Sequence, residues 1–382
     1  MSRNNLLVVT PRKPRCSQEW LRQHAMAMRE DLAATATYEA AGESWIDGVP
    51  NIEVGHRLAA GRYGLGKLLR IRSNVKASHL ADADLTGAVV HFAHLYDLLS
   101  PPNGPIAELP TAVYVHGIDI TWSPLKRFPI PYKHLANTRS YQKRLIEYAE
   151  RVVYLANSDH SRTRLIAAGL PEHRVRTCYL PVERRVDVQR VERPSGRVDL
   201  VYLGRLIGCK GPMDVVRAVK LARQAGADVR LTIIGDGHLR EPTGRLVDEL
   251  SLSGSVQMLG ALSNDAAMRH LAASDALILH NQTDNRTGQI EAFGYAHAEA
   301  LVHGVPVLTG ASGGPTEFLV DGHNALLVEP GDVAHQAEQI LKLAYDDSLH
   351  QNLVDGAMES GARLFSSEAH RATVLSAIRG AS

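Results

Sequence analysis

The feature that most constrains the fold of this 382-residue chain is the regular alternation of short apolar runs with helix-like stretches. Such alternation is typical of α/β domains whose parallel strands are joined by helices. In the first half the expected strands are 6–10, 88–93, 112–116 and 152–156, and the expected helices are 19–32, 138–150 and 161–168. In the second half the expected strands are 199–203, 229–234, 256–259, 276–280, 305–309 and 325–328, and the expected helices are 213–224, 238–252, 264–273 and 333–345.

Periodicity is lost between 184 and 198, where Arg, Val, Glu, Pro, Ser and Gly follow one another without pattern. We interpret this stretch as a linker between a domain at 1–190 and a domain at 198–364. Open parallel sheets bind ligands outside the carboxyl ends of their strands. The sequence therefore predicts two Rossmann-like α/β domains that face a central cleft.

Composition favours a soluble globular protein and no nucleic-acid partner, because 42 basic residues nearly balance 41 acidic ones. The cysteines Cys16, Cys178 and Cys209 have no metal-ligand spacing and fit a reducing compartment. The apolar run at 6–9 is followed by Pro11 and is too short for a signal peptide or a membrane span. We expect a cytoplasmic location.

Two carboxylates, Glu291 and Glu299, stand eight positions apart, the first in a Gly-containing loop and the second one turn into a short helix that Gly304 closes. A loop that feeds a helix N-terminus offers free N–H groups to a polyhydroxylated or anionic ligand. The carboxylates can then accept hydrogen bonds from the vicinal diols of a hexose and a ribose. By itself the spacing is more often a pair of solvated charges.

Three further loops follow expected strands of the second domain. Gly204, Arg205 and Lys210 lie after the first strand, where two cations and a close backbone suit a diphosphate, although solvated loop charges fit equally well. Gly235 permits a turn after the next strand. Leu262 follows another expected strand. The backbone there either contacts the edge of a nucleobase or only leads the chain out of the sheet. The chain has neither a Walker motif nor G-x-G-x-x-G after a first strand, which disfavours ATP hydrolysis and dinucleotide chemistry.

The order of these motifs resembles the donor half of the retaining GT-B glycosyltransferases of family four, across roughly residues 201–332. The motifs that carry the resemblance are Leu203-Gly204-Arg205, Lys210-Gly211, Ile234-Gly235-Asp236-Gly237, the spaced glutamates, His303-Gly304-Val305-Pro306-Val307, Gly313-Gly314-Pro315-Thr316-Glu317 and Asp321-Gly322-His323-Asn324-Ala325-Leu326-Leu327-Val328.

The resemblance implies roles for individual residues. Arg205 and Lys210 would hold the diphosphate of a nucleotide sugar, Glu291 would lie beside the transferred sugar, and Glu299 would accept the ribose hydroxyls. Backbone amides near Phe293, Gly294 and Tyr295 would reach the sugar or a phosphate. Ala292 departs from the family, which commonly has glycine there, so the donor sugar is left open.

In the first domain, His116 ends an expected strand and is followed by Gly117, Ile118 and Asp119. A lone histidine at a strand end is more often a structural hydrogen-bonding group. The segment resembles the subgroup that builds bacterial exopolysaccharide, in which this histidine contacts the transferred sugar. The resemblance also implies that the tail 365–382 packs back on the first domain.

Two basic segments have alternative interpretations. Arg12, Lys13 and Arg15 replace the Gly-rich loop of many relatives and are either a phosphate site or, as we favour, solvated charges. Residues 67–76 form a basic amphipathic stretch that suits anionic lipid and a lipid-linked acceptor. An ordinary helix packed through Leu68, Leu69 and Ile71 is the favoured alternative.

The resemblance implies retaining transfer of a hexose from a nucleotide-diphosphate sugar, with UDP favoured over GDP. The expected acceptor is a hydroxyl of a glycan, a lipid-linked intermediate or a small natural product. No cofactor or essential metal is expected, and a location at the inner face of the membrane is compatible with such an acceptor. The alternatives are a non-catalytic homologue that binds nucleotide sugar or acts as a scaffold and, with less support, a nucleotide-sugar epimerase.

Overall fold

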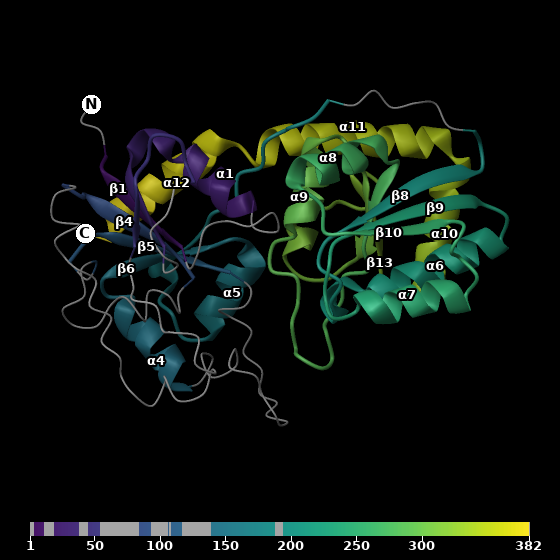
Figure 1. The fold of residues 1–382 in the computed structure, drawn as a ribbon. Helices are drawn as coiled ribbons and strands as arrows, with labels where there is room; N and C mark the ends of the chain where they lie inside the picture. Colours follow the sequence, from purple (N-terminus) through teal and green to yellow (C-terminus); the bar gives the residue numbers. More distant parts are fainter. Residues whose placement is uncertain are drawn as a thin grey trace. The chain divides into compact units, whose positions relative to one another are not determined.

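The computed structural model describes residues 4–10, 19–37, 45–53, 84–92, 106, 108–116, 139–187 and 194–381. The chain divides into two compact units, which Figure 1 colours from purple to yellow along the sequence. Unit 1 comprises Met1–Pro181 with Ser367–Ser382, and unit 2 comprises Val182–Ser366. Each unit is built around a sheet in which all the described strand pairs are parallel, as the alternation of strands and helices predicts.

The sheet of unit 1 has the strand order β3-β2-β1-β4-β5-β6-β7. Its strands are β1 (Leu6–Thr10), β2 (Leu32–Thr37), β3 (Asn51–Glu53), β4 (Gly87–His91), β5 (Thr111–Val115), β6 (Val152–Ala156) and β7 (Val175–Thr177). The described helices of this unit are α1 (Glu19–Ala27), α4 (Arg139–Tyr148), α5 (Asp159–Ala167) and α12 (Ser367–Gly380). Strands β1, β4, β5 and β6 are buried at every position, because helices cover both faces of the sheet.

Alternate residues of these strands pack on opposite faces. Val113 and Tyr154 face an apolar core that includes Leu145 of α4 and Leu165 of α5. The other face carries α12, which Figure 1 shows beside α1. A Cβ atom at Gly87 would lie only 2.6 Å from a methyl carbon of Ile378, so α12 packs directly on the backbone of β4.

The predicted helix at 19–32 is wrong at its carboxyl end. Helix α1 stops at Ala27, a 3-10 turn (η2, Arg29–Asp31) follows, and Leu32 begins β2. The alanine-rich segment of β2 lacks the apolar alternation of a half-exposed strand. It is a strand because it pairs with β1 and β3 and is largely buried, and this tertiary pairing overrides the helical preference of alanine.

The sheet of unit 2 has the strand order β10-β9-β8-β11-β12-β13. Its strands are β8 (Arg197–Leu203), β9 (Asp228–Ile234), β10 (Val256–Gly260), β11 (Ala276–Ile278), β12 (Val307–Gly310) and β13 (Ala325–Val328). Its helices are α6 (Pro212–Gln224), α7 (Arg240–Glu249), α8 (Asn264–Ala273), α9 (Tyr295–Val302), α10 (Val333–Tyr345) and α11 (Asp347–Leu364). Figure 1 shows α6 and α7 on one side of this sheet and α8 and α11 on the other.

Unit 2 begins earlier than the predicted boundary between 190 and 198. The Val182 N–H donates to the Phe365 carbonyl at 3.1 Å. The Arg185 N–H donates to His303 Nε2 at 3.2 Å, and its guanidinium donates to Asn264 Oδ1 at 3.2 Å. These contacts attach residues just after Pro181 to unit 2, whereas the predicted linker rested on composition alone.

The C-terminal tail divides between the two units after Ser366. Helix α12 lies in unit 1, where the Arg371 guanidinium binds the Asp31 carboxylate at 2.6 Å. His370 Nε2 lies 2.7 Å from His24 Nδ1 of α1. The tail from 367 onward is therefore an integral part of the first unit, on the side of the sheet that α1 covers.

Candidate functional site

The strand order of unit 2 creates a topological switch point between β8 and β11. From β8 the chain proceeds to β9 on one side, whereas β11 lies on the other side of β8. Ligands of open parallel sheets bind outside the carboxyl ends of the strands at such a point. The loop after β8 carries Gly204, Arg205 and Lys210, and the loop after β11 leads to Glu291. The topology thus brings these predicted residues to one edge of the sheet.

Lys210 is held in place by its own backbone. It ends a 3-10 turn (η6, Gly208–Lys210) that is hydrogen-bonded to the segment after β11. The Lys210 carbonyl accepts from the His280 N–H at 3.2 Å, and the Cys209 carbonyl accepts from the Gln282 N–H at 3.0 Å. The two switch-point loops are therefore joined backbone to backbone, which is why β11 ends at Ile278 rather than at the predicted position 280.

Lys210 and Glu291 form an ion pair, with 2.8 Å between Lys210 Nζ and Glu291 Oε2. Only 11% of the Lys210 side chain and 17% of the Glu291 side chain are exposed, so solvent screens the pair weakly. Burial by itself raises the pKa of Glu291. The charge and hydrogen bond of Lys210 outweigh burial and, with smaller contributions from His297 and Arg205, hold the pKa of Glu291 at about 2. Glu291 is therefore ionised at neutral pH.

Glu291 is also bound to the start of α9. Gly294 is the N-cap of this helix and has a left-handed backbone, with φ of +86°. Its N–H donates to Glu291 Oε1 at 3.2 Å. The two oxygens of the Glu291 carboxylate therefore have different partners, a side-chain cation and a backbone amide at a helix N-terminus.

The glycines of the loop at 310–317 support the backbone of Glu291. The Gly314 N–H donates to the Glu291 carbonyl at 2.9 Å. A Cβ atom at Gly314 would lie 2.0 Å from the Ala292 carbonyl oxygen, and one at Gly313 would lie 2.1 Å from the Glu291 carbonyl oxygen. No side chain fits at this distance. The loop contributes to the site by close backbone packing.

His297 is a site residue that the sequence analysis missed. It is fully buried in α9, with its Nε2 atom 3.3 Å from Asn281 Nδ2. Burial and the Lys210 charge lower the pKa of His297, Glu291 and the Gly294 backbone oppose them, and the resulting pKa is about 3. His297 is therefore neutral beside the ion pair. Its only sequence signal is that a histidine stands in an eight-residue helix whose other residues, apart from Glu299, are Tyr, Ala, Leu and Val.

Glu299 lies in the second turn of α9, as predicted, and is 6% exposed. Asn264 Nδ2, at the start of α8, lies 3.4 Å from Glu299 Oε1. Leu262 stands two residues before Asn264 in the loop between β10 and α8 and is half-buried. This hydrogen bond joins the loop of Leu262 to the helix of Glu299. Glu291 and Glu299 have separate partners and do not act as one carboxylate pair.

The turns after β8, β9 and β10 are packed against one another. The Gly235 N–H donates to the Gly260 carbonyl at 2.8 Å, and a Cβ atom at Gly235 would lie 1.9 Å from the Gly204 carbonyl oxygen. Arg205 extends from this layer and is exposed, whereas Lys210 is buried. The two predicted diphosphate cations therefore differ in environment, one fixed within the site and one at its solvent edge.

The ring of Phe293 belongs to the core of unit 2. It packs with Phe318 at 5.6 Å and Phe365 at 6.0 Å between ring centroids, and only 2% of the residue is exposed. The neighbouring Tyr295 is half-buried. Phe293 thus anchors the loop that carries Glu291. The predicted contacts of the Phe293, Gly294 and Tyr295 amides with a ligand stay predictions.

His116 directly follows β5 in unit 1 and is buried within a cluster of rings, so it does not stand alone as the sequence suggested. Its Nε2 atom lies 3.2 Å from Nδ1 of His91, the last residue of β4. The Trp20 ring lies 4.5 Å and the Phe92 ring 4.6 Å from it, centroid to centroid. His24 contacts His91 on the side of α1. The other predicted site residues belong to unit 2.

Acidification is expected to destabilise unit 1. Burial, reinforced by neighbouring histidines, lowers the pKa of His24 and His91 well below the usual value, and burial lowers that of His370 to about 4. The unfolded chain binds these protons near pH 6.5 and the folded unit does not, so stability is retained above about pH 6.5 and lost toward pH 4. For His370 alone the loss at about pH 5 is roughly 2 kcal/mol.

All three tryptophans, at 20, 45 and 122, belong to unit 1, so their fluorescence reports the unfolding of this unit. Urea unfolding followed by this signal should show a lower midpoint at about pH 5 than at about pH 7.5. Equal midpoints would show that the histidines are not held neutral by the fold.

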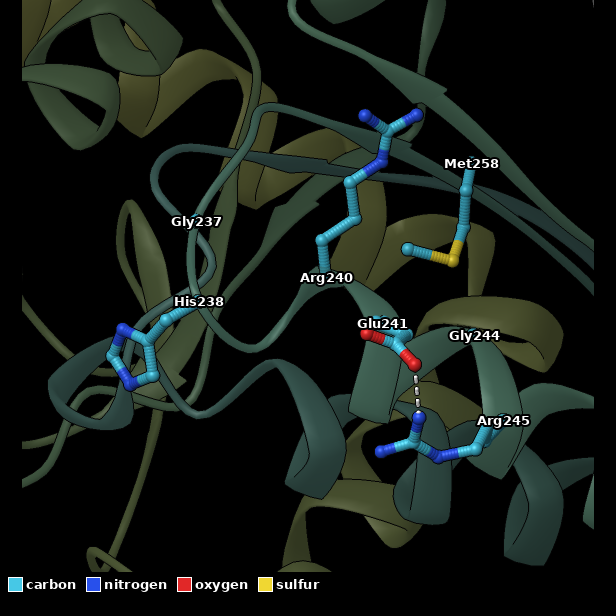
Figure 2. Close-up of a pocket in the computed structure, with 7 residues that line it drawn as sticks. All are labelled: Gly237, His238, Arg240, Glu241, Gly244, Arg245 and Met258. Atoms are coloured by element: carbon cyan, nitrogen blue, oxygen red, sulfur yellow. Dashed lines mark hydrogen bonds and ion pairs between the residues drawn. The ribbon is translucent and has the colours of Figure 1, made fainter.

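A shallow hollow of about 670 Å³ lies at the start of α7, and Figure 2 shows the side chains around it. Its lining residues are Gly237, His238, Arg240, Glu241, Gly244, Arg245 and Met258. The Arg240 guanidinium reaches Gly260 at the end of β10, and Glu241 pairs with Arg245. Neither Lys210 nor Glu291 lines this hollow. We therefore define the site by the switch point and the buried ion pair.

Three predictions concern residues outside the described part of the chain: the basic segments 12–15 and 67–76, and the residues 117–119 after His116. Within the described ranges, no group of three or more His, Cys, Asp or Glu side chains is arranged to hold a metal ion. No helix of these ranges is long and apolar enough to cross a membrane. Catalysis without an essential metal stays a prediction.

The two parallel sheets and the switch-point site define a two-domain, Rossmann-like protein, and solved structures share this fold. The crystal structure of Anabaena HepE with UDP and glucose matches with a TM-score of 0.72 at 17% identity, covering 98% of this chain and 99% of that one. Sucrose-phosphate synthase from Thermosynechococcus elongatus matches with a TM-score of 0.75 at 15% identity, covering 99% of each chain. The fold is the GT-B architecture of glycosyltransferases.

Residues 183–359 match the family described as glycosyl transferases group 1, and this range contains Lys210, Glu291 and Glu299. The matched range lies within the second unit. The lipopolysaccharide core biosynthesis glycosyltransferase LpsE of Rhizobium meliloti is 30% identical over 236 residues, which are 59% of this chain and 66% of LpsE.

A GDP-mannose-dependent phosphatidylinositol monomannoside mannosyltransferase of Mycobacterium tuberculosis is 26% identical over 242 residues, which are 60% of this chain and 59% of that protein. The matches thus span about three fifths to two thirds of these relatives.

Proposed function

We propose that the protein is a retaining glycosyltransferase that moves a hexose-type sugar from a nucleotide-diphosphate donor to a hydroxyl acceptor. The observation that carries this proposal is the buried Lys210–Glu291 pair at the switch point of unit 2, within the range that matches the family. A fixed cation at the carboxyl edge of a parallel sheet suits a leaving diphosphate.

In the proposed reaction, the bond between the anomeric carbon and the β-phosphate oxygen breaks, and the diphosphate takes up the electron pair. Lys210 and the exposed Arg205 stabilise the charge that develops there. The Lys210 ammonium has three donors, so it can bind a phosphate oxygen while one donor stays on Glu291 Oε2. Glu291 then remains beside the transferred sugar, and the buried pair is already oriented before the donor arrives.

Retention follows if the acceptor hydroxyl attacks the face from which the diphosphate departs. The departing phosphate oxygen then accepts the proton of the acceptor hydroxyl, and the new bond joins the acceptor oxygen to the anomeric carbon. This route needs no protein nucleophile. Proton NMR of the first-formed product tests it: the anomeric configuration of the donor supports retention, and the opposite configuration contradicts it.

Glu299 is the proposed acceptor for the ribose hydroxyls, because it is a buried carboxylate beside the loop of Leu262. Glu299→Ala is expected to weaken nucleotide binding by about 10- to 100-fold, since each hydrogen bond to a charged group contributes roughly 1.5–3 kcal/mol. Calorimetric titration measures the change, with the exposed Glu338→Ala on α10 as the matched control. Equally weakened nucleotide binding in both variants, or unchanged binding in Glu299→Ala, would show that Glu299 does not bind the ribose.

We propose UDP as the favoured nucleotide of the sugar donor and GDP as the second choice. HepE was solved with UDP and glucose, and the mannosyltransferase relative depends on GDP-mannose. The proposed acceptor is a glycan, a lipid-linked intermediate or a small natural product, and the lipopolysaccharide relative LpsE supports the first of these. An acceptor of this kind fits a cytoplasmic enzyme working at the inner face of the membrane.

A further inference from the structure

The histidines of unit 1 form a connected series, of which only His116 has a predicted contact with the transferred sugar. His91 ends β4, and its register partner on β5 is Tyr114, so His91 lies beside the strand end that carries His116. The rings of His91 and His116 are nearly parallel, at 13°, and their nearest nitrogens are 3.2 Å apart. Both residues are buried, His91 completely. His91 is therefore a direct hydrogen-bond partner of the predicted sugar-contacting histidine.

The direction of this hydrogen bond follows from the other nitrogen of His91. Among the residues that the structure describes, His91 Nε2 is buried and has no hydrogen-bond partner. A buried N–H without an acceptor is rarer in proteins than an acceptor without a donor. The single proton of neutral His91 is therefore on Nδ1, and His91 Nδ1 donates to His116 Nε2.

The groups around His91 keep it neutral. His24 stands edge-on to it, at 87° and 4.4 Å between centroids, and Tyr114 stacks on it at 9°. Burial and, to a smaller degree, the nearby His116 and His370 lower the pKa of His91 well below its usual value. A neutral imidazole has one N–H and one lone pair, so it orients its partner in one direction only.

The consequence for His116 is a fixed tautomer. If Nε2 of His116 accepts a hydrogen bond from His91, its own proton must be on Nδ1. We propose that His91 is a positioning residue that holds His116 as a hydrogen-bond donor toward the transferred sugar and keeps it from acting as a general base. This inference rests on the proposed function for the identity of the ligand and on the His91–His116 contact alone for the tautomer.

Long-range proton–nitrogen NMR of histidine-labelled protein tests the tautomer without any substrate. His116→Asn identifies the signals of His116 by their loss. We expect wild-type His116 to show a protonated Nδ1 and an unprotonated Nε2. A proton on Nε2 would overturn the inference, and this readout remains available even if the protein transfers no sugar.

A matched pair of substitutions tests the effect on transfer. His91→Asn retains an amide donor near the position of Nδ1, and His91→Leu has a similar shape without a donor. We expect His91→Leu to lower kcat about 10- to 100-fold, as for other groups that orient a functional histidine. We expect His91→Asn to retain most of the activity and both variants to bind nucleotide normally, because the donor site lies in unit 2.

Equal loss in both variants would show a packing role and contradict the inference. If His91→Leu fails to fold, the wild-type NMR result and the activity of His91→Asn still test whether His91 positions His116. Failure of wild-type protein to bind any nucleotide would instead contradict the proposed function and leave the tautomer result standing.

Discussion

Replacing Lys210 by methionine is expected to lower kcat/KM for sugar transfer by about 10²- to 10³-fold. Methionine keeps an unbranched stem over Gly204, where Lys210 Cδ lies 3.2 Å from the position of a Cβ atom, but removes the cation. The substitution also leaves Glu291 buried without its ion-pair partner, which lowers the free energy of unfolding by about 3 kcal/mol. Steady-state kinetics and thermal unfolding measure the two effects separately.

The ionisation of Glu291 should change in the same variant. Burial raises the pKa of this carboxyl and Lys210 lowers it, so the pKa rises from about 2 when the cation is removed. The double variant Lys210→Met, Glu291→Gln should recover stability, because no buried charge is left unpaired, without recovering transfer. The exposed Lys342→Met on α10 is the matched control. Transfer by Lys210→Met at the rate of this control would contradict the role of Lys210.

Replacing Gly314 by alanine is expected to cause the second-largest loss. Its Cβ atom would lie 2.0 Å from the Ala292 carbonyl oxygen and 2.7 Å from the Ala292 carbonyl carbon. The backbone of Glu291 must therefore move, and a displacement of about 1 Å near a reacting centre reduces kcat/KM about 10²-fold. Overpacking of this kind also lowers the free energy of unfolding by about 1–3 kcal/mol, which corresponds to a decrease of roughly 2 to 12 °C in Tm for a unit of this size.

Gly254→Ala is the control for Gly314→Ala. Neither glycine has a positive φ, and a Cβ atom at Gly254 has no neighbour within 4 Å. The two substitutions therefore differ in contact and not in backbone preference. A normal kcat/KM for Gly314→Ala would show that the Glu291 loop is not held by the glycine contact.

The fold was largely predictable where local signals agree with tertiary pairing. The expected helices 264–273 and 333–345 coincide with α8 and α10, because Ser263 and Asp332 cap them and their apolar faces repeat with helical period. β2 was not predicted, because the alanine-rich segment from Leu32 acquires its strand conformation only by pairing between β1 and β3. The unit boundary at Pro181 depends on hydrogen bonds of Arg185 to distant residues, which composition does not show.

The site could be predicted only as far as residue types and their order allow. The sequence identified Lys210 and Glu291 separately, but their ion pair depends on the junction of two loops at the switch point. His297 and His91 could not be found, because one stands in a short helix of mostly apolar residues and the other ends a buried strand. His297 contacts Asn281, 16 positions earlier in the chain, and His91 contacts His116, 25 positions later, so only the folded sheet brings these partners together.

Calorimetric titration of the wild-type protein and Lys210→Met with UDP, GDP and ADP tests directly whether the switch-point site binds the donor diphosphate. We expect saturable binding of one of these diphosphates to the wild type and much weaker binding to Lys210→Met, with the control Lys342→Met unchanged. Binding of no nucleotide by the wild type would contradict the assignment of the switch-point site and would favour a scaffold role. Equal binding by wild type and Lys210→Met would place the diphosphate elsewhere.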